Sequence, residues 1–130
     1  MPDPATKPRL FVVDDEFVIS TTLATILQRS GFDAEAFTNP LKALEAASQN
    51  PPDLLISDVM MPELSGIELA IRMQSAHPSC RVLLFSGQAA TANLLEEASK
   101  QGHNFELLSK PIHPADLLQK IKSVTQATFS

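Results

Sequence analysis

The feature that most constrains the fold of this chain is a fivefold alternation of short apolar runs with longer segments of helical periodicity. Most of the short runs are nearly continuous in apolar side chains, which is typical of strands buried on both faces of a parallel sheet. The expected strands are Leu10–Val13, Ala34–Phe37, Asp53–Ser57, Arg81–Phe85 and Phe105–Leu108. Because β and α elements of this length alternate, we expect a parallel α/β sheet with right-handed crossovers and helices on both faces.

The segments between the runs carry helix boundary signals. Asn39-Pro40 is typical of an N-cap followed by the first helical residue, and Ser65 to Glu68 is typical of a capping box. Gly31 suits the position just beyond the end of the first helix. The side chains expected to face the core from the helices include Ile19, Leu23, Leu27, Leu41, Leu44, Ala47, Ile67, Ile71, Ala98, Leu117, Leu118, Ile121 and Val124.

The composition favours one globular domain, since 44% of the 130 residues are hydrophobic and 19% are charged. We expect a flexible N-terminal leader at residues 1–7, one domain at residues 8–127 and no output domain. The net charge of −5 argues against a broad interface with nucleic acid or an anionic membrane. The single cysteine, Cys80, and the lack of a signal-peptide pattern favour a cytoplasmic location.

Polar residues suited to phosphate and metal chemistry follow four of the expected strands. Asp14-Asp15 follows the first strand, Asp58 the third, Ser86 the fourth and Lys110 the fifth. These positions meet in one cleft, because ligands of doubly wound sheets bind at the carboxyl ends of the strands. Carboxylates about 4 Å apart repel by roughly 4 kcal/mol at an effective dielectric constant near 20, so we expect Lys110 and Mg²⁺ to neutralise them. A nucleophile, a metal, a cation and a hydroxyl are the parts that phosphoryl transfer requires.

This set of residues, in its order and spacing, resembles the receiver domain of two-component response regulators over nearly the whole chain. The matching motifs are Asp14-Asp15, Asp58-Val59-Met60-Met61-Pro62, Gly66, Ser86-Gly87 and Lys110-Pro111. The resemblance implies a flavodoxin-like (βα)5 fold, as in CheY-like proteins, with the strand order 2-1-3-4-5. The resemblance therefore adds a specific strand order to the expectation of a parallel sheet.

The resemblance also implies a magnesium site and a phosphoacceptor. Asp58 would accept the phosphoryl group from a phosphohistidine donor, and Asp15 would bind Mg²⁺ directly. Asp14 would hold metal-bound water, and the backbone carbonyl of Met60 would complete the metal site. Magnesium is thus the one cofactor that the resemblance implies.

Two residues would bind the phosphoryl oxygens, Ser86 and Lys110, and Ser86 would also act in the switch. The family usually places an aromatic switch residue three positions before the lysine, where this chain has Leu107. Phe105 lies two residues earlier, on the same side of the strand, and is the candidate replacement.

The partners implied are a sensor histidine kinase or a histidine phosphotransfer protein as donor, and an unidentified downstream protein. The signal would pass through the face formed by the fourth helix, the fifth strand and the fifth helix. Direct contact with nucleic acid or a membrane is not expected. Receivers of this family catalyse their own phosphorylation and hydrolysis, so an enzyme with an external metabolite substrate is not expected either.

Three other functions would use some of the same residues. A Mg²⁺-dependent phosphotransferase or phosphatase with an Asp nucleophile typically has a second Asp two residues later, where this chain has Met60. A nucleotide or flavin module usually has a Gly-rich loop after the first strand, where this chain has Asp14-Asp15. A degenerate receiver would act by protein binding alone, and the complete set of site residues argues against it.

Each site residue also has an ordinary structural explanation. The acidic run Asp14 to Glu16 would suit the cap of the first helix, and Asp58 would suit a turn. Lys110 would suit an exposed surface position and Ser86 would suit a turn, and each of these explanations is common for a single residue. All four together are improbable, so we favour the cleft.

Overall fold

The strands form one parallel sheet whose order matches the expectation. The computed structural model describes residues 7–87, 91–103, 105–110 and 112–129, with only the backbone described at 91–94 and 125–129. The sheet has five strands in the order β2-β1-β3-β4-β5, which confirms the doubly wound flavodoxin-like topology. The strands are β1 (Arg9–Val13), β2 (Asp33–Phe37), β3 (Leu54–Asp58), β4 (Arg81–Ser86) and β5 (Glu106–Ser109). Most of the expected leader at residues 1–7 lies outside the described residues.

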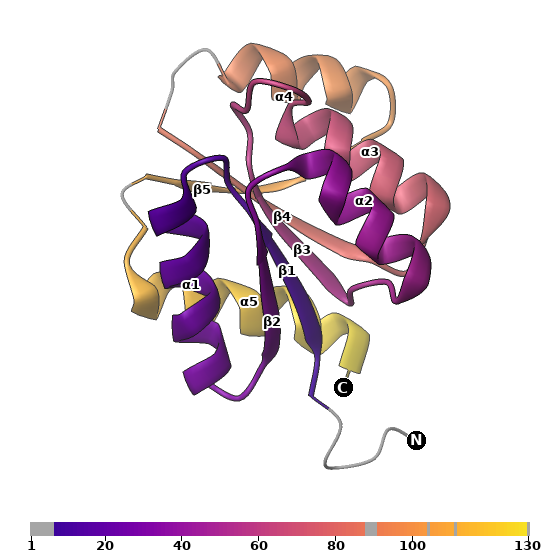
Figure 1. Ribbon diagram of the computed structural model, residues 1–130. Coiled ribbons are helices and arrows are strands. Elements are labelled where there is room, and N and C mark those ends of the chain that lie inside the picture. Colours follow the sequence, from indigo (N-terminus) through magenta and orange to yellow (C-terminus); the bar gives the residue numbers. More distant parts are fainter. Residues whose placement is uncertain (1–6, 88–90, 104, 111, 130) are drawn as a thin grey trace.

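Five helices connect the strands and cover both faces of the sheet. They are α1 (Phe17–Arg29), α2 (Pro40–Gln49), α3 (Gly66–Ala76), α4 (Thr91–Lys100) and α5 (Pro114–Phe129). Helices α1 and α5 lie on one face, and α2, α3 and α4 lie on the other (Figure 1). Within the described part of the chain, no helix is long and apolar enough to span a membrane.

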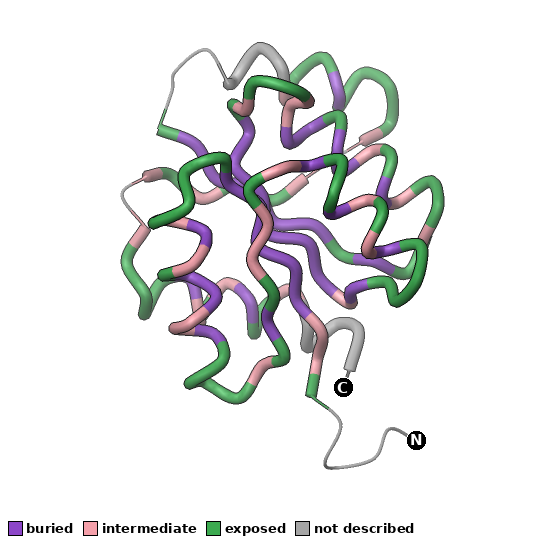
Figure 2. The backbone as a smooth tube through the Cα atoms, viewed as in Figure 1, coloured by how far each residue is buried: buried purple, intermediate pink, exposed green. Residues whose placement is uncertain are grey.

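Alternation of side chains along the central strands divides the core into two layers. In β1, Phe11 and Val13 belong to the layer under α2, α3 and α4, whereas Leu10 and Val12 belong to the layer under α1 and α5. All four side chains are fully buried. Figure 2 shows this pattern as buried strands enclosed by helices whose outer surfaces are exposed. The central strands are therefore rigid supports for the residues that follow their carboxyl ends.

The helix boundaries follow the expected chemistry. The Asn39 side chain caps α2 by accepting a hydrogen bond from the backbone N–H of Leu41, at 2.8 Å. The Ser65 hydroxyl caps α3 by accepting from the N–H of Glu68, at 3.1 Å. Gly31 has a φ of +99°, which an L side chain rarely adopts, and it follows the end of α1 as expected.

The expected inward position of Leu41 is wrong. Leu41 is 49% exposed, and the buried face of α2 is formed by Pro40, Ala43 and Ala47. These three residues lie on one side of a helix with 3.6 residues per turn, and Leu41 lies about 100° away from Pro40. Leu44 is half-buried and packs against the same core layer, so the rest of the expected inward face of α2 holds.

Candidate functional site

The carboxyl ends of β1, β3, β4 and β5 bring the expected site residues into one cleft. Ser57 of β3 pairs with Val13 of β1, and Asp58 of β3 pairs with Phe85 of β4, so residues far apart in sequence end at the same sheet edge. The cleft has a volume of about 290 Å³. It is lined by Asp15, Glu16, Asp58, Met60, Ser86, Gly87 and Lys110.

Asp14 follows β1 directly and is completely buried. Its backbone N–H donates to the carbonyl of Phe37 at 3.1 Å, which fixes it beside β2. Its Oδ1 accepts from the N–H of Glu16 at 2.9 Å, whereas its Oδ2 has no hydrogen bond with any described residue. Burial, together with the nearby charge of Asp58, raises the pKa of the Asp14 carboxyl above its usual value.

The capping explanation for the acidic run is not supported. Glu16 occupies the N-cap position of α1, but no side-chain hydrogen bond caps that helix. The Asp14 side chain closes its own turn instead of reaching into the helix. Asp15 is exposed beside the cleft. The acids therefore face the cleft without serving the helix terminus through hydrogen bonds.

Asp58 is the last residue of β3 and is 6% exposed. The next residue continues the β3–β4 contact, since the N–H of Val59 donates to the carbonyl of Phe85 at 3.0 Å. The Oδ1 of Asp58 lies 3.4 Å from the N–H of Met60. Its carboxylate is thus held at the sheet edge with a small part open to solvent.

Lys110 supplies the positive charge of the cleft. Its Nζ lies 3.3 Å from Oδ2 of Asp58 and 3.6 Å from Oδ2 of Asp14. Its backbone N–H donates to the carbonyl of Ser86 at 3.0 Å, and its Nζ lies 5.3 Å from the centre of the Phe85 ring. Burial of the ammonium works to lower its pKa, but the charges of Asp58 and Asp14 outweigh burial, so the pKa of Lys110 is raised.

Gly66 allows α3 to begin against the acceptor strand. A β-carbon at Gly66 would overlap the backbone carbonyl oxygen of Asp58 and would lie 3.0 Å from Oγ of Ser57. The N–H of Gly66 donates to the carbonyl of Val59 at 2.8 Å, and the Ser57 hydroxyl donates to the carbonyl of Asp58 at 2.9 Å. The first turn of α3 therefore packs against the end of β3 and the loop that follows it.

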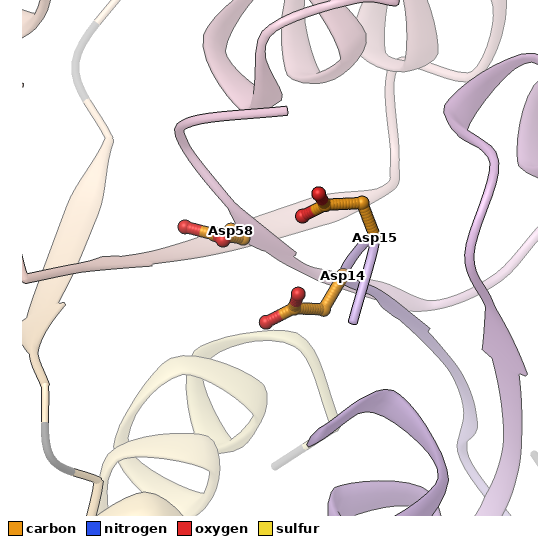
Figure 3. A group of neighbouring side chains, drawn as sticks. All are labelled: Asp14, Asp15 and Asp58. Atoms are coloured by element: carbon orange, nitrogen blue, oxygen red, sulfur yellow. The ribbon is translucent and has the colours of Figure 1, made fainter. Parts of the chain in front are cut away.

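The three aspartates have the arrangement and chemistry of a site for a hard divalent cation. Carboxylate oxygens of Asp14, Asp15 and Asp58 all lie within 4.8 Å of one another, and Figure 3 shows the three side chains grouped together. The buried Oδ2 of Asp14, which lacks a hydrogen-bond partner among the described residues, is an oxygen that a cation or its water would satisfy. Oxygen ligands of this kind suit Mg²⁺.

The expected switch residues lie on β4 and around β5. Ser86 ends β4, is 6% exposed and pairs in register with Ser109 of β5. Leu107 is 37% exposed. Phe105 is half-buried, packs against the core layer under α2, α3 and α4, and stacks on His103 with ring centres 6.1 Å apart. Phe105, which lies directly before β5, is thus packed against the core, whereas Leu107 within β5 is exposed.

Two contributors were not assigned a role from the sequence. Glu16 lines the cleft and is one of the charges that raise the pKa of Lys110. Its place directly after Asp14-Asp15 was the available signal. Gly66 matched the family motif, but its close contact with Asp58 depends on how α3 meets β3, which no local pattern reveals.

The doubly wound sheet with three clustered aspartates at its carboxyl ends is consistent with a phosphoacceptor domain, and the family comparison agrees. Residues 10–122 match the response regulator receiver domain, and the chain belongs to this family. A receiver domain of a two-component system is therefore what these residues form.

Relatives include both a free-standing receiver and larger regulators. The response regulator receiver protein CpdR of Brucella abortus is 32% identical over 116 residues, which cover 89% of this chain and 95% of CpdR. The transcriptional regulatory protein CreB of Escherichia coli is 29% identical over 118 residues, which cover 91% of this chain but 51% of CreB. This chain thus spans nearly all of one relative and about half of the other.

Solved structures resemble this one along most of its length. A receiver domain protein from Clostridium thermocellum superposes with a TM-score of 0.82 at 26% identity, covering 93% of this chain and 96% of that one. The chemotaxis protein CheY4 of Vibrio cholerae superposes with a TM-score of 0.79 at 28% identity, covering 92% of this chain and 99% of that one. Both agree with the flavodoxin-like fold.

Proposed function

We propose that Asp58 is the phosphoacceptor of this receiver and takes its phosphoryl group from a phosphohistidine. The observation that carries the proposal is the position of the Lys110 ammonium, within 3.6 Å of both Asp58 and Asp14. One cation thereby faces two carboxylates at the mouth of a cleft. This arrangement suits a nucleophilic carboxylate that must approach an anionic group.

In the proposed step, a carboxylate oxygen of Asp58 attacks the phosphorus atom of the donor. A phosphorus–oxygen bond forms as the phosphorus–nitrogen bond breaks, and the donor imidazole leaves with the electron pair. Lys110 and Ser86 bind the oxygens of the transferred group, and Lys110 offsets their charge. Asp14, Asp15, Asp58 and the carbonyl of Met60 are proposed to hold Mg²⁺, which when bound neutralises further phosphoryl charge.

The acyl phosphate that results would be hydrolysed at the same site, which restores the carboxylate. The cleft of about 290 Å³ has room for a phosphoryl group and water. No external metabolite is needed in this cycle, so we propose a switch and not a metabolic enzyme. The proposed receiver domain spans residues 8–127, and the cytoplasmic location stays a prediction from the sequence.

The donor is proposed to be a sensor histidine kinase or a histidine phosphotransfer protein that docks beside α1. An apolar pocket of about 590 Å³ adjoins the cleft and shares Lys110 with it. The pocket is lined by Val18, Ile19, Thr22, Leu23, Lys110 and Ile112. Phe17 and Val18 at the start of α1 are 69% and 73% exposed, which leaves apolar surface for a partner. A downstream protein is proposed to read the α4–β5–α5 face.

Intact mass spectrometry after incubation with acetyl phosphate and Mg²⁺ tests this function. We expect one added phosphoryl mass, which chelation of Mg²⁺ and the variant Asp58→Asn both abolish. Asp53→Asn is a matched control, because Asp53 precedes β3 and lies outside the residues that line the cleft. A normal adduct on Asp58→Asn would contradict the assignment.

A further inference from the structure

A second groove lies between α3 and α4, on the face of the sheet that these helices cover. The two helices are neighbours in the fold (Figure 1). The groove has a volume of about 400 Å³. It is lined by Glu63, Leu64, Ser65, Ile67, Glu68, Ile71, Glu97, Ala98 and Gln101, none of which lines the cleft around Asp58.

The floor of the groove is apolar. Ile67 and Ala98 are almost fully buried, and Leu64 and Ile71 are half-buried against the core. Apolar atoms that remain open to solvent gain free energy when a partner covers them. The floor therefore suits an apolar side chain presented by another molecule.

The rim of the groove is acidic. Glu63, Glu68 and Glu97 are exposed, and none of them forms an ion pair with another residue that the structure describes. Lys100 of α4 pairs instead with Glu96, at 4.0 Å. Among the residues that the structure describes, no Lys or Arg lines the groove. Three unpaired negative charges around an apolar floor complement a segment that has both apolar and basic side chains.

One wall of the groove, α3, begins at the candidate phosphorylation site, and the other wall, α4, follows that site in the chain. The first residue of α3, Gly66, contacts the carbonyl of Asp58, and its N–H donates to Val59. Helix α4 is the next helix after Ser86 and Gly87, and Gly87 lies against the side chain of Lys110. A partner in this groove would contact the two helices that directly follow the strands bearing Asp58 and Ser86.

We propose that the α3–α4 groove is a docking site for a basic amphipathic segment of a partner protein. Leu64, Ile67, Ile71 and Ala98 receive its apolar side chains, and Glu63, Glu68 and Glu97 pair with its Lys or Arg residues. This surface is separate from the pocket beside α1 and does not include β5 or α5. Its occupation does not depend on the assignment of Asp58, because no residue of the acidic cleft takes part.

The probe for the test is a helical peptide with Leu along one face and Lys along the other. Its binding to the full chain is followed by amide NMR shifts in saturating Mg²⁺, which removes the three aspartates as competing acids. We expect saturable shifts concentrated at residues 63–71 and 95–101, and no saturable binding of the matched Leu–Glu peptide. Shifts scattered over the surface, or centred on α1, would overturn the proposal.

The double variant Glu68→Gln and Glu97→Gln removes one charge from each wall. We expect it to weaken binding of the Leu–Lys peptide by roughly 3- to 10-fold, as expected for two exposed ion pairs. The matched control is Glu45→Gln with Asp116→Asn, since both residues are exposed and Asp116, like Glu68, lies in the first turn of its helix. Equal weakening in both double variants would show a general charge effect and would refute the groove.

Discussion

The α-carbon of Gly66 lies so close to the backbone carbonyl of Asp58 that a β-carbon at position 66 would overlap the carbonyl oxygen. The first turn of α3 therefore rests directly on the peptide group of the candidate phosphoacceptor. A hydrogen bond at this junction, from the N–H of Gly66 to the carbonyl of Val59, is 2.8 Å long. Any displacement of α3 would move the loop that positions the Asp58 carboxylate.

The variant Gly66→Ala should lower the free energy of unfolding by about 1–3 kcal/mol, because the added methyl forces backbone apart in a packed region. Urea denaturation measures the loss. Gly87→Ala is the comparison, since its β-carbon would lie 3.4 Å from Cβ of Lys110, close to an ordinary contact. We expect Gly87→Ala to cost less than about 1 kcal/mol. Similar losses in both variants would contradict the steric explanation.

Magnesium should stabilise the folded chain, because the proposed site of assembled carboxylates exists in the folded chain and not in the unfolded one. At an Mg²⁺ concentration 100 times the dissociation constant, the expected gain is about 2.7 kcal/mol. Asp15→Ala should abolish most of the rise in Tm, and it removes an exposed side chain without opening a cavity. Asp33→Ala, at an exposed acid of β2, is the control. An unchanged Mg²⁺ response in Asp15→Ala would refute the metal assignment.

Replacing Lys110 by Met keeps an unbranched apolar side chain but removes the charge shared by Asp14 and Asp58. Phosphorylation by acetyl phosphate should slow by about 10²-fold, the usual effect of removing one group that stabilises developing charge. The fold should persist, because Lys110 is half-buried and belongs to neither core layer. Lys110→Arg retains the charge and should recover part of the rate. The rates follow from intact-mass time courses.

The two-layer architecture was predictable because most of the strands are recognisable in the sequence as apolar runs. Phe11, Leu55 and Leu84 sit where a parallel sheet buried on both faces requires them. Ala47 is buried as expected, but the error at Leu41 arose because periodicity favours large side chains, whereas Pro40 and Ala43 share the buried face with Ala47. Strand β2 also begins earlier than expected, at Asp33, which pairs in register with Arg9 and forms an ion pair with it at 3.6 Å. An Asp rarely favours a strand, so this start depends on a partner 24 residues earlier.

The membership of the acidic site was predictable because sheet topology dictates which loops meet. Asp14 follows β1, Asp58 ends β3 and Lys110 follows β5, and the parallel strand order brings these carboxyl ends to one side of the sheet. The Oδ2 of Asp14, which has no hydrogen bond with a described residue, and the Gly66–Asp58 contact were not predictable. Both depend on side-chain direction and on the distance between α3 and β3, which residue types do not encode locally.

The burial of Cys80 predicts how the stability of the fold depends on pH. The thiol is 1% exposed, and burial raises its pKa to about 12. In the unfolded chain the thiol has a pKa near 8.5, so the native state disfavours the thiolate. The contribution of the buried thiol to the free energy of unfolding is therefore fully present below about pH 8.5. It is lost as the pH rises towards the folded pKa, and the loss is about 2 kcal/mol at pH 10. Denaturation of Cys80→Ala at pH 8 and pH 10 should lack this part of the pH dependence.

The same burial predicts that Cys80 is protected from thiol reagents in the native state. Alkylation by iodoacetamide at pH 8 should be slow in buffer and fast in urea, and its rate should follow the unfolding transition. Fast alkylation of the native chain would show that the thiol opens to solvent locally.

The final prediction concerns how phosphorylation reaches β5. Ser86 pairs with Ser109 of that strand, so movement of Ser86 towards a phosphoryl group would pull on β5. Phe105 is packed against the core and stacked on His103, whereas Leu107 is 37% exposed and has no ring. If the unphosphorylated and phosphorylated conformations differ in free energy by only a few kcal/mol, the phosphoryl group can shift their populations.

Beryllofluoride, which mimics the phosphoryl group, should therefore shift the amide NMR signals of the cleft and those of residues 105–109. Phe105→Leu should reduce the β5 shifts and leave the cleft shifts intact, because it removes the packed ring but not the anion site. Leu107→Ala is the matched control and should reduce neither set, since its side chain contributes little to the buried core. If the β5 shifts persist in Phe105→Leu and vanish in Leu107→Ala, then Leu107 is the switch residue and Phe105 only fills the core.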